Sequence, residues 1–153
     1  MPRPAPDGRR NPGPGLEEAG AAAMVAAASP GEAQAMAERS VLSTHVLNTA
    51  QGVPAEGVGV ELWRLEPAEE LLCRTATGPD GRAVDPLLPA AAFLPGRHEL
   101  RFGLGDYFRR RGLGADPPYL DVVPVRIFLA ADGSHYHVPL LCTPWSYTTY
   151  RGS

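Results

Sequence analysis

The chain has 153 residues, of which 17 are glycine and 17 are proline, and its net charge is −3 with histidine counted as neutral. This length allows one domain of ordinary size with a tail, and it excludes a large multidomain protein. The acidic balance provides no basic surface for nucleic acid or anionic lipid, and no apolar run approaches the roughly 18 residues of a membrane span. We therefore expect neither a nucleic-acid partner nor a membrane.

The first 38 residues differ in composition from the rest of the chain. Residues 1–35 are rich in alanine, proline and glycine, and all eleven aromatic residues lie from Trp63 onward. A segment with so little apolar surface cannot offset the entropy lost when it becomes ordered. We therefore expect residues 1–38 to form a disordered tail and residues 39–153 to form the domain.

Two alternatives exist for this tail. Arg9-Arg10 followed by an alanine-rich run resembles an export signal, although Glu17 and Glu18 interrupt it, so we expect a cytoplasmic protein. A start of translation at Met36 would instead remove the tail altogether.

From Ser40 onward, short runs typical of β-strands alternate with turn residues about every ten positions, which favours an all-β sandwich or barrel. In the first run, Ser43 and His45 share one face of the strand. The expected strands are Val41–Thr49, Val58–Trp63, Leu71–Thr77, His98–Gly103, Val122–Leu129, His135–Cys142 and Ser146–Tyr150.

The segments between these strands carry their own signals. Asp80-Gly81 predicts a hairpin turn, with Arg82–Asp85 as the start of a returning strand. Leu87–Leu94 is rich in alanine and leucine and predicts a short helix, whereas Gly105–Gly114, with three consecutive arginines, predicts a solvated turn or a helical cap. We expect the turn at residues 130–133 to join its two flanking strands as a hairpin.

Proline and cysteine add two further expectations. Pro124 and Pro139 interrupt the two strands of that last hairpin, which favours edge positions or bulges for both strands. Cys73 and Cys142 lack the spacing of a redox or metal motif, so we expect two reduced, partly buried thiols.

The histidines are the candidates for chemistry, because the chain contains no P-loop, Gly-x-Ser-x-Gly or His-Glu-x-x-His motif. His135 and His137 are two residues apart on a predicted strand, so they project to one face, where both could approach a zinc ion or a reacting carbonyl. His45 lies within another strand among small polar residues. A zinc site formed by His135, His137 and His45 is one alternative for this cluster.

Four segments, in this order, resemble the transthyretin-like 5-hydroxyisourate hydrolases: residues 42–48 (LSTHVLN), 77–82 (TGPDGR), 135–141 (HYHVPLL) and 150–153 (YRGS). The terminal tetrapeptide is the most discriminating, since transthyretin, the hormone carrier of the same fold, lacks this ending and the histidines. Around the last strand, Cys142-Thr143 and Trp145-Ser146 replace the usual Leu-Ser and Tyr-Gly of the family.

The resemblance implies an all-β, transthyretin-like (prealbumin-like) sandwich of two four-stranded sheets with one short helix. It implies a homotetramer with active sites in a channel between subunits, and hydrolysis of 5-hydroxyisourate to 2-oxo-4-hydroxy-4-carboxy-5-ureidoimidazoline in uric acid breakdown. The mechanism expected from this resemblance needs no metal and no organic cofactor. Matching of the motifs assigns catalytic roles to His45, Arg82 and His137, with His135 as a second candidate, and substrate binding to Tyr150, Arg151, Gly152 and Ser153.

These residue types suit such chemistry. Imidazole has the ordinary pKa closest to that needed to deprotonate water near neutral pH, so His45 and His137 could share activation of the water and proton delivery to the leaving nitrogen. Arg82 could hold two substrate oxygens and stabilise a developing oxyanion. The main alternative is a transthyretin-like carrier of a small ligand, but such a carrier needs an apolar channel rather than a histidine-lined one.

Overall fold

The computed structural model describes residues 40–152, so the expected tail, the export signal, the alternative start and Ser153 lie outside the described residues. Within this range the chain forms strands, one 3-10 helix (η1, Ala90–Ala92) and one α-helix (α2, Leu104–Arg110). The strands are β1 (Ser40–Asn48), β2 (Val53–Pro54), β3 (Gly59–Arg64), β4 (Glu70–Ala76), β5 (Leu88–Pro89), β6 (Gly96–Gly103), β7 (Val122–Leu129), β8 (Tyr136–Cys142) and β9 (Tyr147–Thr149).

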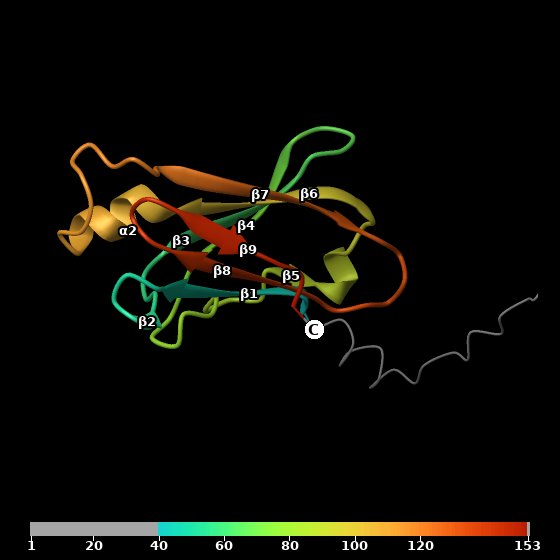
Figure 1. The fold of residues 1–153 in the computed structure, drawn as a ribbon. Coiled ribbons are helices and arrows are strands. Elements are labelled where there is room, and N and C mark those ends of the chain that lie inside the picture. The colour runs from blue at the N-terminus through green and yellow to red at the C-terminus, as the bar shows by residue number, and fades with distance from the viewer. Residues whose placement is uncertain (1–39, 153) are drawn as a thin grey trace, which may run out of the picture.

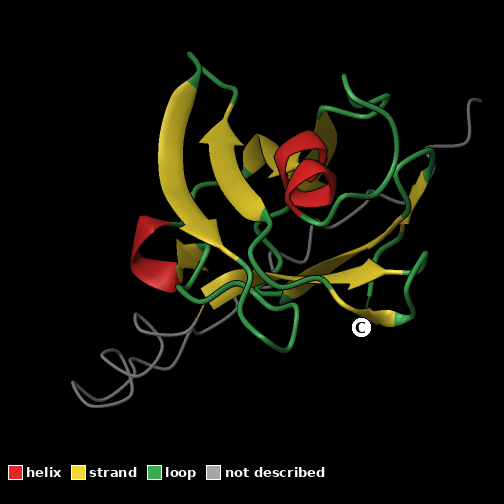
Figure 2. Ribbon diagram, turned by 90° about the vertical axis from the view of Figure 1, so that its left-hand side faces the viewer, coloured by secondary structure: helices red, strands yellow, loops and turns green. Residues whose placement is uncertain are grey.

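The strands form a two-layered β-sandwich, which confirms the predicted fold class (Figure 1). The first sheet has the order β2-β1-β8-β9, with β5 paired to β1, and the second has the order β4-β3-β6-β7. Figure 2 shows the two sheets as separate layers. The first sheet thus contains one short strand more than the four expected, because Leu88 pairs with the beginning of β1.

The alternation of β1 places one set of side chains in the core and the other on the outer face of the first sheet. Leu42 and Val46 are fully buried between the sheets, whereas Ser43 and His45 are only partly buried. Burying each large apolar side chain contributes about 1.5–3 kcal/mol to stability. The largest fully buried side chains of this core include Tyr107, Phe102, Phe108, Leu62, Leu88, Leu100, Leu104, Leu129 and Leu140.

The predicted hairpin between the strands at residues 122–129 and 135–142 is wrong. β7 pairs with β6 in the second sheet, whereas β8 pairs in parallel with β1 in the first sheet. Sheets in a sandwich lie about 10 Å apart, and the six-residue connection is long enough to cross from one layer to the other. Because the two strands lie in different sheets, Val125 of β7 and Val138 of β8 both point into the core between the sheets.

The two prolines have different outcomes. Pro124 lies in β7, which is an edge strand of the second sheet, as predicted. Pro139 lies in β8, which has neighbours on both sides, so the edge prediction is wrong there. β9 pairs with Leu140–Cys142, and the next bridge on that side joins His137 to Gly152, so Pro139 falls between the two pairings.

The helix prediction is also corrected. The segment predicted to be helical contains β5 and the single turn η1, whereas α2 occupies the segment predicted as a turn or cap. Leu104, Tyr107 and Phe108 of α2 are buried, and this spacing gives the helix an apolar face that packs at one end of the sandwich (Figure 1). Its last turn contains Arg109 and Arg110, where positive charge interacts favourably with the helix dipole.

The returning strand predicted at Arg82–Asp85 is reduced to isolated bridges, which join His45 to Arg82 and Thr77 to Ala83. Both cysteines are free thiols. In the described part of the chain, no helix is long and apolar enough to cross a membrane.

Candidate active site

Two neighbouring strands and one turn bring the three predicted catalytic side chains to the outer face of the first sheet. β1 and β8 run in parallel, with Ser43 opposite His137 and His45 opposite Pro139. The turn after β4 runs along the other side of β1, where a bridge joins His45 to Arg82. Residues more than 90 positions apart in the sequence therefore form one cluster.

The turn before Arg82 explains how this residue reaches the site. Gly81 has φ +77°, a conformation that favours glycine, and its carbonyl accepts a hydrogen bond of 2.8 Å from the backbone N–H of Val46 in β1. A Cβ at this position would lie 3.1 Å from Cδ2 of His45 and would collide with the Val46 carbonyl. Asp80 closes the turn, since its Oδ1 accepts the Arg82 N–H at 2.9 Å.

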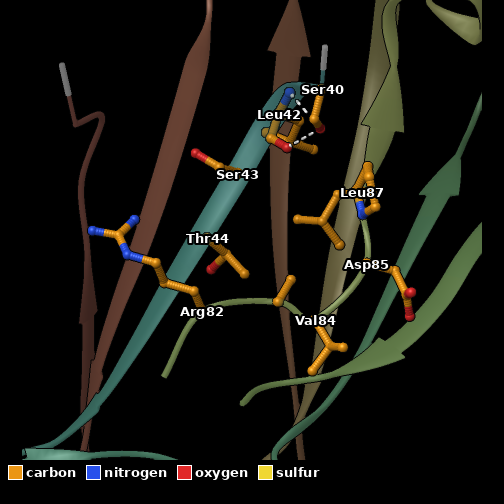
Figure 3. A pocket seen from close by; sticks show the side chains of 10 residues that line it. Ser40, Leu42, Ser43, Thr44, Arg82, Val84, Asp85 and Leu87 are labelled. Atoms are coloured by element: carbon orange, nitrogen blue, oxygen red, sulfur yellow. Dashed lines mark hydrogen bonds between the residues drawn. The ribbon is translucent and has the colours of Figure 1, made fainter. Parts of the chain in front are cut away.

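A cavity of about 290 Å³ lies between β1 and the segment that follows the turn. In Figure 3 the Arg82 side chain extends toward the side of β1 on which Ser43 lies, whereas Val84 and Leu87 lie on the other side. The Arg82 guanidinium therefore points away from most of this cavity and toward the outer face that bears the histidines.

Contacts on two sides hold the imidazole of His137. Its Nδ1 forms a hydrogen bond of 2.9 Å with Oγ of Ser43. On the other side, the Gly152 N–H donates to the backbone carbonyl of His137 at 2.8 Å, and a Cβ on Gly152 would lie 2.6 Å from Cδ2 of the ring. Glycine at this position therefore allows the C-terminal backbone to lie directly against the ring.

The surroundings of His137 favour its neutral form. Partial burial lowers the pKa of His137 below its ordinary value, and the positive charges of Arg82, His135 and His45 lower it further, while a hydrogen bond with the Ser43 backbone opposes them. A neutral imidazole at pH 7 has one unprotonated nitrogen, which can accept a proton from water.

The side chains of the C-terminal tail lie in different places. Gly152 contacts His137, whereas the Arg151 guanidinium stacks 4.7 Å from the ring centre of Tyr136. Tyr150 is exposed and lines, with Arg151, a groove of about 490 Å³ between the sheets, along β7 and β9. The structure thus brings His45, Arg82, His137 and Gly152 together on one face, and it places the Tyr150 and Arg151 side chains along this groove.

His135 precedes β8 and is exposed, although its charge still acts on His137. Among residues 40–152, no group of three or more histidine, cysteine, aspartate or glutamate side chains is arranged to hold a metal ion. The zinc alternative therefore has no candidate set of protein ligands in this part of the chain.

The sequence analysis did not identify Ser43 as a functional residue. Its contact with His137 depends on the pairing of β1 with β8, which joins residues 94 positions apart. One feature of the sequence could have indicated Ser43: it shares a strand face with His45, so it can contact a side chain that lies next to His45.

Comparisons with known proteins agree with this architecture. The model of the HIUase/Transthyretin family matches residues 42–152. The 5-hydroxyisourate hydrolase 2 of Rhizobium meliloti (strain 1021) is 49% identical over 120 residues, covering 77% of this chain and 100% of the relative. The solved structure of Klebsiella pneumoniae 5-hydroxyisourate hydrolase is 34% identical, has a TM-score of 0.61, and is matched over 73% of this chain and 92% of that one.

A transthyretin structure from Sparus aurata shares the fold, with a TM-score of 0.67 at 24% identity over 74% of this chain and 97% of that chain. The matched region contains His45, Arg82 and His137 with the turn that precedes Arg82, and it extends to Gly152. The chain therefore belongs to the HIUase/Transthyretin family.

Proposed function

We propose that this protein hydrolyses 5-hydroxyisourate to 2-oxo-4-hydroxy-4-carboxy-5-ureidoimidazoline, a ring-opening step of uric acid degradation. The observation that carries the proposal is the environment of His137, where burial and the charge of Arg82 favour a neutral imidazole, in a chain whose curated relatives are 5-hydroxyisourate hydrolases. A neutral imidazole next to a fixed positive charge supplies the base and the anion-stabilising group that amide hydrolysis needs.

In this mechanism His137 accepts a proton from water as the water oxygen attacks the carbonyl carbon of the ring amide. The carbonyl oxygen becomes an oxyanion, which the Arg82 guanidinium stabilises with its charge and its hydrogen-bond donors. The carbon–nitrogen bond then breaks, and the leaving nitrogen receives a proton from His137 or His45. The atoms of one water are thereby divided between the new carboxylate and the released nitrogen.

The surroundings of the two histidines support His137 as the base. Its ring is held by Ser43 on one side and by the Gly152 backbone on the other, and its pKa is lowered by burial and by Arg82. His45 lies beside the Gly81 turn and next to Arg82, a position suited to donating a proton or a hydrogen bond to the substrate. Of the tail, Gly152 lies against the His137 ring and would contact the substrate, whereas the Tyr150 and Arg151 side chains lie along the groove beside β7 and β9.

We also propose a homotetramer in the cytoplasm. The support for assembly is the partial exposure of the outer face that carries the site, because a second copy placed over this face would convert it into an enclosed channel. Light scattering coupled to size-exclusion chromatography should give four times the mass of the chain, and a monomeric mass would contradict the assembly. Cell fractionation tests the compartment.

A stopped-flow ultraviolet assay tests the reaction. Uric acid is oxidised by a urate oxidase with and without the protein, and the decay of the hydroxyisourate band should accelerate when the protein is present. Replacement of His137 or His45 by Asn should slow this decay by about 10²-fold or more, the contribution typical of a general acid or base.

Two matched variants complete the test. Arg82→Gln should also lose most turnover, whereas Arg109→Gln removes an exposed arginine of α2 and should not. Decay that is unchanged by the wild-type protein would contradict the proposed function and favour the carrier alternative.

A further inference from the structure

We infer that Ser43 is a positioning residue, which holds the His137 imidazole with its proton on Nδ1 and leaves Nε2 free to accept a proton. This inference rests on the proposed function for its catalytic meaning, while the geometry of the pair is independent of the substrate. Ser43 lies directly opposite His137 in the parallel pairing of β1 with β8, and its Oγ is 2.9 Å from Nδ1. This distance is that of a normal hydrogen bond.

The contacts of the ring limit its orientation. Turning the ring by half a turn would exchange Nδ1 with Cδ2, which would remove Nδ1 from Ser43 and bring it against the Gly152 backbone. Gly152 already lies so close that a Cβ there would be 2.6 Å from Cδ2. The imidazole therefore has one favoured orientation, with Nδ1 toward Ser43 and Nε2 at the free tip of the ring.

Only one direction of this hydrogen bond is compatible with both the neutral and the protonated form of His137. A serine hydroxyl can donate or accept, but both nitrogens of an imidazolium can only donate. If Nδ1–H donates to Ser43 Oγ, the same bond persists when Nε2 takes up a proton during the reaction. In the opposite direction, the hydroxyl would have to turn away each time His137 became positively charged.

Electrostatics favour the same direction. The charged imidazolium donates a stronger hydrogen bond from Nδ1 to Oγ than the neutral ring does, so this bond favours the charged form and opposes a fall in the pKa of His137. Burial and the positive charge of Arg82 act the other way and favour neutral His137. Ser43 thus orients the base and also limits how far its pKa falls.

The experiment uses the full chain labelled with ¹⁵N in histidine. At a pH where His137 is neutral, its ring-nitrogen chemical shifts should show Nδ1 protonated and Nε2 unprotonated in the wild type. Ser43→Ala should give a mixture of the two tautomers, whereas Ser43→Thr, which keeps a hydroxyl, should restore the wild-type pattern. Thr44→Val is the matched control, since it removes a hydrogen bond of 2.7 Å from β1 to the Val138 carbonyl on the inner face of the same sheet.

Kinetics should separate positioning from a purely structural role. We expect Ser43→Ala to lower kcat by about 10-fold to 100-fold, by analogy with the loss seen when the partner of the second nitrogen of a metal-binding histidine is removed, with a smaller change in KM. The acidic limb of the pH profile should move to lower pH, because the imidazolium loses the Oγ that accepts a hydrogen bond from its Nδ1. Thr44→Val should reduce stability while leaving kcat and the pH profile unchanged.

Three results would overturn the inference: an unprotonated Nδ1 in the wild type, identical tautomers in wild type and Ser43→Ala, or a Ser43→Ala variant that loses stability alone. If the wild type fails to hydrolyse 5-hydroxyisourate, the proposed function fails. The tautomer measurement would still decide whether Ser43 orients His137.

Discussion

Replacement of Gly152 by alanine should damage the site through a single methyl group. The new Cβ would lie 2.6 Å from Cδ2 of His137 and 3.2 Å from its Cβ and Cγ. Carbon atoms in good contact are about 3.5–4.0 Å apart, so the ring or the tail has to move by roughly 1 Å. A misplacement of about 1 Å at a reacting group can cost about 10²-fold in rate, which is the loss of kcat/KM that we expect.

The loss of stability should be small by comparison. Movement of the tail would weaken the hydrogen bond from the Gly152 N–H to the His137 carbonyl, worth about 0.5–1.5 kcal/mol. Urea unfolding followed by circular dichroism measures this change, and the stopped-flow assay measures turnover. A displaced ring should appear mainly in kcat, whereas a displaced tail should appear mainly in KM.

Gly59→Ala is the matched control. Gly59 lies at the start of β3 in the other sheet, and a Cβ there would meet no heavy atom within 4 Å. This variant should keep the kcat and KM of the wild type. If Gly152→Ala also keeps both constants, the close approach of the tail to His137 has no role in catalysis and the reasoning is refuted.

Three further substitutions test other parts of the structure. Gly81→Ala forces a side chain into φ +77° against a β1 carbonyl, so we expect a loss of about 1–3 kcal/mol in urea unfolding together with reduced turnover; wild-type stability would contradict the turn geometry. Burial lowers the pKa of His98, so as the pH falls this imidazole takes up a proton in the unfolded chain before it does so in the folded protein. The free energy of unfolding should therefore decrease below about pH 6.5. In His98→Gln this decrease should be less steep. Glu99 is 3% exposed and accepts hydrogen bonds of 2.6 Å from Arg101 and from the exposed Arg126. Glu99→Gln should therefore lower the free energy of unfolding by about 1–2 kcal/mol at pH 7, a smaller loss than for an ion pair with both partners buried. An unchanged unfolding midpoint would exclude a stabilising role for Glu99.

The sequence alone determined the local features of this protein. Alternation of small polar and apolar residues predicts β1 and the two faces of that strand, because side chains of a strand point alternately to opposite sides. The motifs around His45, Arg82 and His137 identified the family, which the match over residues 42–152 confirms. Their catalytic roles stay predictions.

The tertiary structure decided what depends on contacts between distant residues. The alternation of residues in β8 is the same whether this strand pairs with β7 or with β1, so the sequence pattern could not exclude the hairpin, and that prediction failed. For the same reason the pattern could not predict the parallel pairing that places Ser43 against His137. The helix was misplaced for a related reason, since the burial of Tyr107 and Phe108 at the end of the sandwich stabilises α2 in a segment whose arginines indicated a turn. Residue types and strand faces are local properties, whereas the orientation of His137 depends on the packing of segments far apart in the chain.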